Sequence, residues 1–171
     1  ARGFAAWVTA HKIPLGPAIG RGISFIKTHG KGFFAVVSTV IQGSVDGVNA
    51  ALAAIPGVVF ILAIAALAWG LHRSVPLVLF ILAALLFIMN QGYWAATLET
   101  LSLVIVSALF STLIGVPVGI AAAHRPRLYA ALRPVLDLMQ TLPTFVYLIP
   151  AIVFFGIGPV PGLIATVIFV L

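Results

Sequence analysis

Long runs of apolar residues without charge constrain this sequence more than any other feature. Residues 55–71, 75–90 and 97–123 together contain one charged side chain, Glu99. An α-helix of about 20 apolar residues crosses the hydrocarbon core of a bilayer. Of the 171 residues 63% are hydrophobic and 7% are charged, whereas a soluble domain has about 25% charged residues. The sequence therefore predicts an all-α fold, a polytopic bundle of membrane helices.

The first 54 residues differ from the rest and are predicted as a basic N-terminal tail followed by an amphipathic helix. Within residues 1–32 we expect at most one short helix, and five of the nine Lys and Arg residues lie there: Arg2, Lys12, Arg21, Lys27 and Lys31. From residue 33 to 55 apolar side chains recur at steps of three and four, which is typical of a helix with one apolar face. Asp46 and Asn49 would be costly in lipid, which favours an interfacial position over a spanning one.

Residues 55–90 are predicted to form a pair of membrane helices joined by the polar turn His72-Arg73-Ser74. The second helix, residues 75–90, would be about 24 Å long, against a hydrocarbon core of about 30 Å. It therefore needs the residues that follow it, where Tyr93 and Trp94 suit the aromatic belt of a membrane interface.

A third helix is predicted over residues 97–123, and it contains the sequence Gly115-Val-Pro-Val-Gly119. Pro117 lacks a backbone donor and is expected to kink this helix, while Gly115 and Gly119 let a neighbouring helix approach closely. A kink that serves packing is favoured here over a hinge that serves a substrate.

The most polar linker of the chain covers residues 124–134, and its three arginines indicate a cytoplasmic position. A fourth helix is expected from Asp137 to Ile157, then a turn over 156–162 and a fifth helix from Leu163. We divide the chain into three regions, residues 1–54, 55–90 and 91–171, and interpret the third as one helical region. Counting helices back from the linker leaves two topologies open. The N-terminal tail is external if residues 33–54 lie on the membrane, and internal if they span it.

A polar cluster in the fourth helix is the best candidate for a translocation path or gate: Gln140, Thr141, Thr144 and Tyr147. Pro143 and Pro150 interrupt the hydrogen-bond ladder of the same helix. Broken backbone at membrane depth survives only where protein or a water-lined cavity satisfies its polar groups. The simpler interpretation, that these residues cap and pack the helix, is slightly favoured over a role in lining or gating a path.

No pattern in the sequence predicts a catalytic, cofactor or metal site. There is no cysteine, and the four histidines are not at zinc-ligand spacing. Gly30-Lys31 lacks the other residues of a phosphate loop. The net charge of +6 comes from scattered loop residues rather than a dense basic run, so that nucleic acid is not an expected partner. We therefore expect a protein that is not an enzyme and needs no cofactor.

Two stretches carry a resemblance to a known family. They are residues 98–125 (LETLSLVIVSALFSTLIGVPVGIAAAHR) and residues 133–162 (RPVLDLMQTLPTFVYLIPAIVFFGIGPVPG). Together they resemble the permease subunit of bacterial ABC importers for glycine betaine and proline, which belong to the type I, binding-protein-dependent importers. The second stretch is the more specific one. The convincing match covers about 91–171, and residues 55–90 fit the layout of the family.

The resemblance implies a multi-pass protein of the bacterial inner membrane that acts with several partners. These are a second permease copy in a homodimer, a cytoplasmic ABC ATPase, and an extracytoplasmic substrate-binding protein or domain. ATP hydrolysis is expected on the ATPase, and the family layout places the N-terminal region outside, which favours an interfacial helix over residues 33–54. The coupling loop of such permeases, with its Glu-Ala-Ala sequence, would lie beyond Leu171, so that the ATPase contact is implied only.

Three alternatives stay open from the sequence. The same architecture would serve choline, carnitine or another amine. A non-transporting membrane scaffold would use its helices for packing alone, and a passive channel would need no ATPase. A further transmembrane region with a coupling loop in the complete gene would separate a permease from a scaffold.

Overall fold

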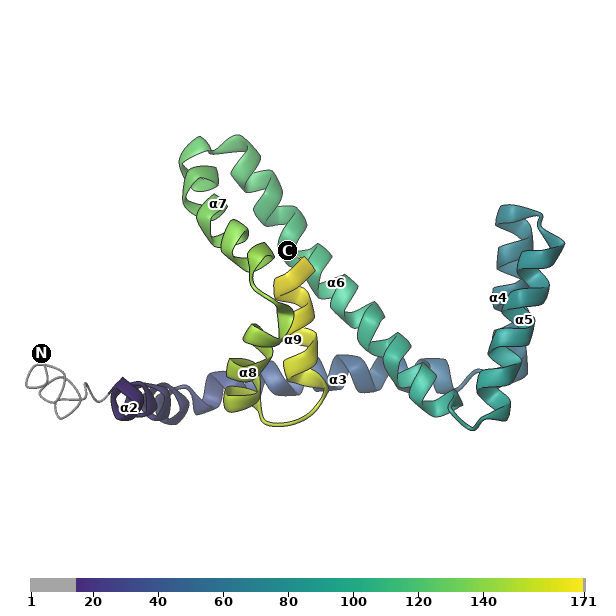
Figure 1. Ribbon diagram of the computed structural model, residues 1–171, viewed down its shortest axis with the longest axis horizontal. Helices are drawn as coiled ribbons and strands as arrows, with labels where there is room; N and C mark the ends of the chain where they lie inside the picture. The colour runs from purple at the N-terminus through teal and green to yellow at the C-terminus, as the bar shows by residue number, and fades with distance from the viewer. Residues whose placement is uncertain (1–14, 171) are drawn as a thin grey trace, which may run out of the picture. The chain divides into compact units, whose positions relative to one another are not determined.

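The computed structural model describes residues 15–170, and all its regular elements in that range are α-helices (Figure 1). The predicted all-α fold is confirmed. The chain divides into two compact units, residues 1–37 and 38–171. The sequence predicts a basic N-terminal tail. Arg2, His11 and Lys12 of this tail lie outside the described residues.

Two helices make up the described part of the first unit. Helix α2 (Leu15–His29) is followed after one residue by α3 (Lys31–Ala53), whose first residues belong to this unit. Lys27 lies near the C-terminal end of α2, where positive charge complements the helix dipole. The described residues of α2 are mostly exposed.

The second unit begins with the rest of α3 and an α-helical hairpin. Helices α4 (Gly57–His72) and α5 (Val75–Asn90) lie side by side (Figure 1), and their role as a membrane-spanning pair stays a prediction. Arg73 ends α4 in the left-handed conformation, with φ of 52°. The axes of α3 and α4 differ by 90° across the short break between them.

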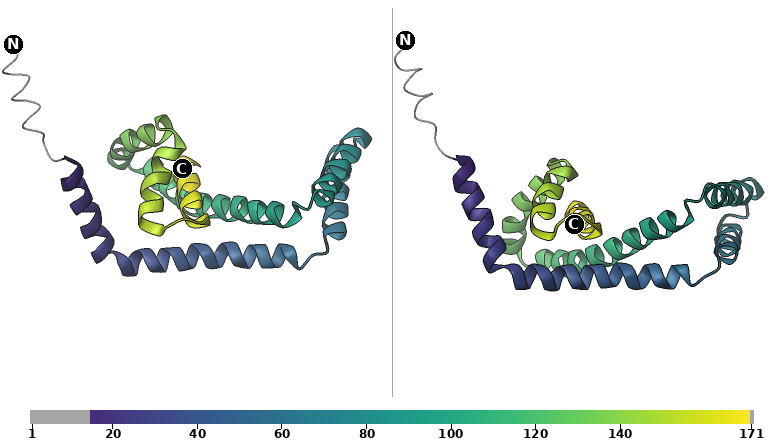
Figure 2. Two further views of the ribbon diagram at one scale, coloured as in Figure 1. Left: turned by 60° about the horizontal axis from the view of Figure 1, so that its bottom comes forward. Right: turned by 90° about the horizontal axis from the view of Figure 1, so that it is seen from below.

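Helix α6 (Trp94–His124) is the element on which the remaining helices assemble. It has 31 residues and is the described helix that is by itself long and apolar enough to cross a membrane. Helix α7 (Pro126–Thr141) turns back beside its C-terminal part (Figure 1). Helices α8 (Thr144–Phe155) and α9 (Pro159–Val170) follow, and α9 packs on both α6 and α8 (Figure 2).

Two expectations for this region are wrong. The polar linker 124–134 is mostly helical, because Pro126 starts a helix well at its first position and Leu128, Leu132 and Leu136 then form a half-buried stripe at steps of four. The single fourth helix is two helices, α7 and α8, with Leu142 and Pro143 between them.

The fifth helix likewise starts four residues earlier than expected. A proline is again the first helical residue, Pro159, and the turn before it is reduced to Gly156-Ile157-Gly158. Gly156 has φ of 83° and Gly158 has φ of 156°, which is backbone that favours glycine.

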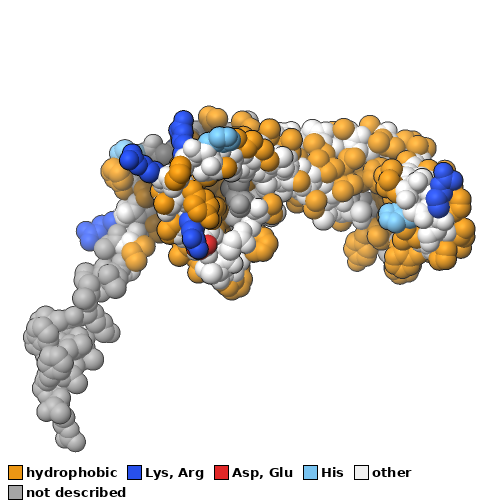
Figure 3. Space-filling model, turned by 90° about the horizontal axis from the view of Figure 1, so that it is seen from above, with side chains coloured by type: hydrophobic (Ala, Val, Ile, Leu, Met, Phe, Trp, Pro, Cys, Tyr) orange, Lys and Arg blue, Asp and Glu red, His pale blue; other side chains and the backbone are white. Residues whose placement is uncertain are grey.

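A small core surrounds α6 and α9, and most other large apolar side chains are exposed. The fully buried residues include Val106 of α6 and Pro161 of α9. On the face shown in Figure 3, hydrophobic side chains cover most of the described surface, and Lys and Arg form a few isolated groups. Such a surface suits hydrocarbon better than water. If each of the two bent helix pairs, α3 with α4 and α7 with α8, counts as one span, the described residues hold up to 3 candidate spans.

Candidate functional site

The four polar residues predicted from the sequence all lie at the elbow between α7 and α8, defined here as residues 138–147. The two helix axes differ by 99° across this elbow. Gln140 and Thr141 are in the last turn of α7, whereas Thr144 and Tyr147 are in the first turn of α8. The structure therefore brings these residues together at one point.

Tyr147 replaces a backbone hydrogen bond that Pro143 cannot make. In a regular helix the N–H of residue 143 would donate to the carbonyl oxygen of Met139, but proline has no N–H. The Tyr147 hydroxyl lies 3.0 Å from that oxygen and 3.2 Å from the carbonyl oxygen of Leu138. A side chain of α8 thus satisfies the C-terminal end of α7, which would otherwise leave carbonyl groups without donors.

The other elbow residues also bond to the backbone. The Thr141 hydroxyl donates to the carbonyl oxygen of Leu138 at 3.1 Å. The side-chain amide of Gln140 donates to the carbonyl oxygen of Phe169 in α9 at 2.9 Å. Thr144 is half-buried as the first residue of α8. These bonds describe a capping and packing role, and a role in lining or gating a path stays a prediction.

The residues predicted to kink or pack helices lie in three elements. Pro117 is inside α6, Pro150 is inside α8, and Pro143 precedes α8. Gly115 lines a cavity beside α6, and a methyl group added at Gly119 would meet no atom within 4 Å. Their predicted roles in bending and in close helix contact stay predictions.

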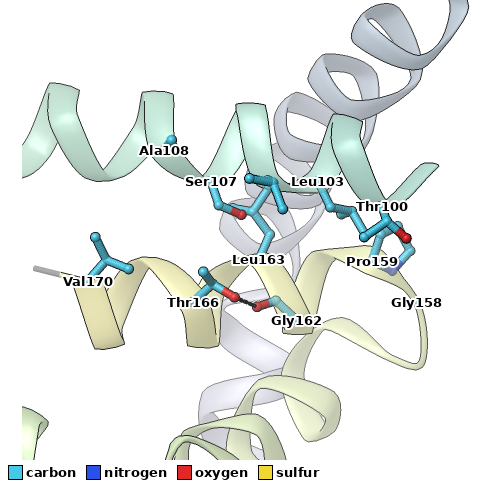
Figure 4. Close-up of a pocket in the computed structure, with 11 residues that line it drawn as sticks. Thr100, Leu103, Ser107, Ala108, Gly158, Pro159, Gly162, Leu163, Thr166 and Val170 are labelled. Carbon is cyan, nitrogen blue, oxygen red and sulfur yellow. Dashed lines mark hydrogen bonds between the residues drawn. The ribbon is translucent and has the colours of Figure 1, made fainter. Parts of the chain in front are cut away.

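A cavity between α6 and α9 was not predicted from the sequence. It has a volume of about 460 Å³, and Figure 4 shows residues of both helices around it. Thr100, Ser107 and Thr166 contribute hydroxyl groups, and the other lining residues are apolar or glycine: Leu103, Val104, Ala108, Gly158, Pro159, Gly162, Leu163 and Val170. None of these lining residues is charged or aromatic.

Two of the hydroxyls in this cavity are already used as donors. The Thr100 hydroxyl donates to the carbonyl oxygen of Ala96 at 2.8 Å, and the Thr166 hydroxyl donates to that of Gly162 at 2.9 Å. Each oxygen keeps lone pairs that can still accept a hydrogen bond. The cavity therefore offers weak acceptors in an apolar wall.

A second, more polar cavity of about 290 Å³ lies between α3 and α6. Its polar lining residues are Gln42, Asp46, Asn49 and Glu99, so that two of the three acidic residues of the chain share it. Both carboxylates are exposed, and the amide of Gln42 donates to Asp46 at 3.1 Å. The buried Ser102 hydroxyl lies 3.5 Å from the side-chain oxygen of Asn49 and joins the two helices.

The sequence did contain a signal for the polar side of α6. The three buried polar residues of the described chain are serines of this helix, Ser102, Ser107 and Ser111. Ser107 and Ser111, which are four residues apart, lie on one face of the helix, whereas Ser102 lies on the side of α3, where it meets Asn49. Within the described residues no group of three or more His, Cys, Asp or Glu side chains could hold a metal ion.

Three curated proteins are similar to this chain in sequence. The glycine betaine transport system permease protein OpuAB of Bacillus subtilis is 42% identical over 158 residues, which cover 92% of this chain and 56% of the relative. The glycine betaine/carnitine transport permease protein GbuB of Listeria monocytogenes is 41% identical over 145 residues, 83% of this chain and 51% of the relative.

The third relative is the glycine betaine/proline betaine transport system permease protein ProW of Escherichia coli. It is 38% identical over 159 residues, which cover 93% of this chain and 45% of the relative. The chain thus spans about half the length of the curated relatives it matches. No family model matches the chain. The resemblance to glycine betaine permeases that the sequence indicates is confirmed.

Proposed function

From the homology of this chain to permease proteins of glycine betaine transport systems, we propose that it is part of the transmembrane permease subunit of an ATP-driven importer. The proposed substrates are osmolytes of the glycine betaine and proline betaine type. The observation that carries this proposal is the identity of 38–42% over 83–93% of the chain.

The cavity between α6 and α9 is compatible with such a substrate. Glycine betaine is a zwitterion without net charge, so that a path for it needs no full charge of its own. The lining of the cavity combines apolar side chains with hydroxyl groups. An isolated buried charge would be costly in this apolar surrounding, and the substrate requires none.

The proposed partners follow from the kind of transport system. A cytoplasmic ATPase supplies the energy, an extracytoplasmic binding protein or domain delivers the osmolyte, and a second permease copy completes the path. The permease itself is not an enzyme, because ATP hydrolysis takes place on the partner. The proposed location is the bacterial inner membrane, which the chain crosses several times.

The proposed topology places α7 at the cytoplasmic side and the N-terminal region outside. Arg125, Arg127 and Arg133 support the position of α7, because positive residues are enriched in cytoplasmic segments. The 90° bend between α3 and α4 supports an α3 that lies along the membrane surface where α4 enters the membrane. Residues 1–54 then form a peripheral region, 55–90 a transmembrane pair and 91–171 a portion of the permease core.

At the elbow, Gln140, Thr141, Thr144 and Tyr147 are proposed to border the path and to hold α8 and α9 in place. Their bonds to backbone carbonyls support the holding role directly. The exposed position of Gln140 and Thr141 leaves polar atoms available for a passing solute.

The test uses the complete protein, purified with its ATPase and binding protein and reconstituted into liposomes. Glycine betaine should stimulate ATP hydrolysis and enter the vesicles against a gradient. Absence of stimulation by any betaine would refute the substrate class. An assembly that binds no ATPase at all would favour the membrane scaffold instead.

A second candidate substrate is carnitine. The name of the Listeria monocytogenes relative includes carnitine beside glycine betaine. Carnitine shares the quaternary ammonium and the carboxylate and adds a hydroxyl and a longer chain. Competition of unlabelled carnitine, choline and proline betaine against labelled glycine betaine would rank the candidates in the same vesicles.

A further inference from the structure

A third cavity continues the cavity between α6 and α9 along α6. It has a volume of about 360 Å³ and is lined by residues of α6 and α9: Ala108, Ser111, Thr112, Gly115, Val116 and Val170. Ala108 and Val170 line both cavities. We call the two together the α6 groove. From Thr100 to Val116 it follows about 24 Å of helix, which is most of a hydrocarbon core of about 30 Å.

Ser111 stands out among the hydroxyl residues of this helix. Its side-chain oxygen is the buried side-chain polar atom for which the described residues provide no hydrogen-bond partner, and Ser111 is 6% exposed. By contrast, the hydroxyls of Thr100 and Ser102 donate to the carbonyl oxygens four residues earlier, at 2.8 Å and 2.7 Å. The Ser111 hydroxyl therefore has a donor that is not used within the helix.

A buried donor without a partner is rare, because leaving it unpaired costs the desolvation of the group. A serine hydroxyl both donates and accepts, and the unused proton of Ser111 is available to an acceptor that enters the groove. None of the residues lining the two cavities carries a charge or an aromatic ring. A quaternary ammonium group would thus find no aromatic cage that held it tightly. A groove with these properties suits the passage of a solute better than tight binding of it.

We infer that the α6 groove carries the transported zwitterion and that Ser111 donates a hydrogen bond to its carboxylate. The inference rests on the proposed function and adds the site to it. The methyl groups of the trimethylammonium end slide along the apolar wall formed by residues such as Leu103 and Leu163. As the solute passes along the groove, the lone pairs of Thr100 and Thr166, whose protons are engaged in the helices, can attract its positive end.

The competing occupant of the groove is another helix of the assembled transporter. Ser107, Ser111, Gly115 and Gly119 recur at steps of four, which is also the spacing of close helix contacts in membranes. In that case Ser111 would bond to a backbone carbonyl of the neighbouring helix, and a water-soluble reagent would not reach it. This difference in access separates the two occupants.

The first experiment measures uptake of labelled glycine betaine into vesicles that hold the complete permease, its ATPase and its binding protein. Ser111→Ala should lower kcat/KM for uptake about tenfold, since a hydrogen bond to a charged group is lost. Ser111→Thr, which keeps the hydroxyl, should restore most of the rate. Ser102→Ala is the matched control, because that buried serine lies outside the groove and its hydroxyl is already bonded to Leu98.

The second experiment tests access and does not depend on the Ala variant folding well. Ser111→Cys is introduced into a complete protein freed of other cysteines and treated with a charged, water-soluble thiol reagent. It should react, and glycine betaine should slow the reaction at least several-fold. Leu109→Cys, at an exposed apolar position of the same helix, should stay unreactive because it faces lipid.

The outcomes separate the two claims. If the unmodified protein transports betaine but Ser111→Ala behaves as Ser102→Ala does, the groove assignment is wrong and the proposed function stands. A thiol in the Ser111→Cys variant that no reagent reaches also overturns the groove assignment and identifies a helix as the occupant. If the unmodified protein transports no betaine, the proposed function fails, and the groove assignment fails with it.

Discussion

The side-chain amide of Gln140 donates a 2.9 Å hydrogen bond to the backbone carbonyl oxygen of Phe169 and so joins α7 to α9. The two residues are 29 positions apart in the chain. Because α9 forms one wall of the α6 groove, this bond links the elbow at the end of α7 to the position of that wall. The acceptor is a main-chain atom, so that the contact does not depend on the phenyl ring of Phe169.

Gln140→Met should weaken this link. Methionine has a similar length but no donor, and one net hydrogen bond is worth about 1 kcal/mol of folding free energy. We expect a lower midpoint of thermal unfolding for the purified protein in detergent. Gln91→Met is the control, because Gln91 is exposed and, among the described residues, its side-chain amide bonds to the neighbouring Asn90. Equal shifts for both variants would contradict a specific role for Gln140.

Tyr147→Phe should destabilise the elbow without removing the ring. The carbonyl oxygen of Met139 then loses a donor that Pro143 cannot supply, at a cost of about 1–3 kcal/mol if it remains buried. Protease sensitivity between α7 and α8 would report the change. Tyr129→Phe, at an exposed tyrosine of α7, should have no such effect.

Tyr147→Ala in the complete transporter separates the two interpretations of the elbow. If Tyr147 borders the path, uptake of glycine betaine should change while the amount of protein in the membrane stays the same. If both fall by the same factor, the residue serves packing alone. Uptake per molecule of membrane-embedded permease is the quantity to compare.

Gly57→Ala should loosen the contact of α4 with α5 and α6. A methyl group at Gly57 would lie 2.6 Å from the terminal carbon of Met89 and 3.2 Å from the Trp94 ring. The flexible Met89 can move, but Trp94 also packs edge-on against Phe60, so that we expect a loss of about 1–2 kcal/mol. Gly70→Ala in the same helix meets no atom within 4 Å and should be neutral or stabilising. The ranking is checked by thermal unfolding in detergent.

Gly156→Ala should strain the turn before α9. The backbone there has φ of 83° and ψ of −173°, a region that is nearly restricted to glycine, and forcing alanine into it costs of order 1–3 kcal/mol. Gly162→Ala is the matched comparison, since it lies inside α9 and an added methyl group has open space around it. Thermal unfolding should rank Gly156→Ala well below Gly162→Ala, and the opposite order would contradict the backbone argument.

The proposed topology predicts opposite labelling of two exposed positions. Arg127→Cys, near the start of α7, should react with an impermeant thiol reagent only from the cytoplasmic side. Gln91→Cys, in the turn between α5 and α6, should react only from the outside. Labelling of intact cells against inverted vesicles measures both, and reaction of both positions from one side would refute the topology.

The sequence predicts best those elements whose ends are marked by local chemistry. Helix α5 has the bounds expected from the sequence, Val75 to Asn90, because a polar turn precedes it and Gly92 follows it. Pro143 predicts an interruption of the hydrogen-bond ladder. The sequence around it does not show that the chain turns by 99° at this point. The start of α7 was not predicted, because the arginines of residues 124–134 indicated a polar linker. The leucines of the same segment, which recur at steps of four, indicate a helix.

The α6 groove could not be predicted from the sequence. A serine in an apolar helix usually bonds to its own backbone, as Ser102 does, and nothing local distinguishes Ser111 from it. The difference arises only where α9 lies against α6 and leaves a cavity at that position. The same holds for Gln140, whose acceptor lies in a helix that is distant in sequence.

The bond from Tyr147 to Met139 has a consequence for biosynthesis. While α7 leaves the ribosome, the carbonyl oxygen of Met139 has no donor, because the next candidate, Pro143, has none. That group is satisfied only after the first turn of α8 has been made and has folded back. Since bare backbone carbonyls are poorly tolerated in hydrocarbon, α8 should enter the lipid only after its first turn has bonded back to the end of α7.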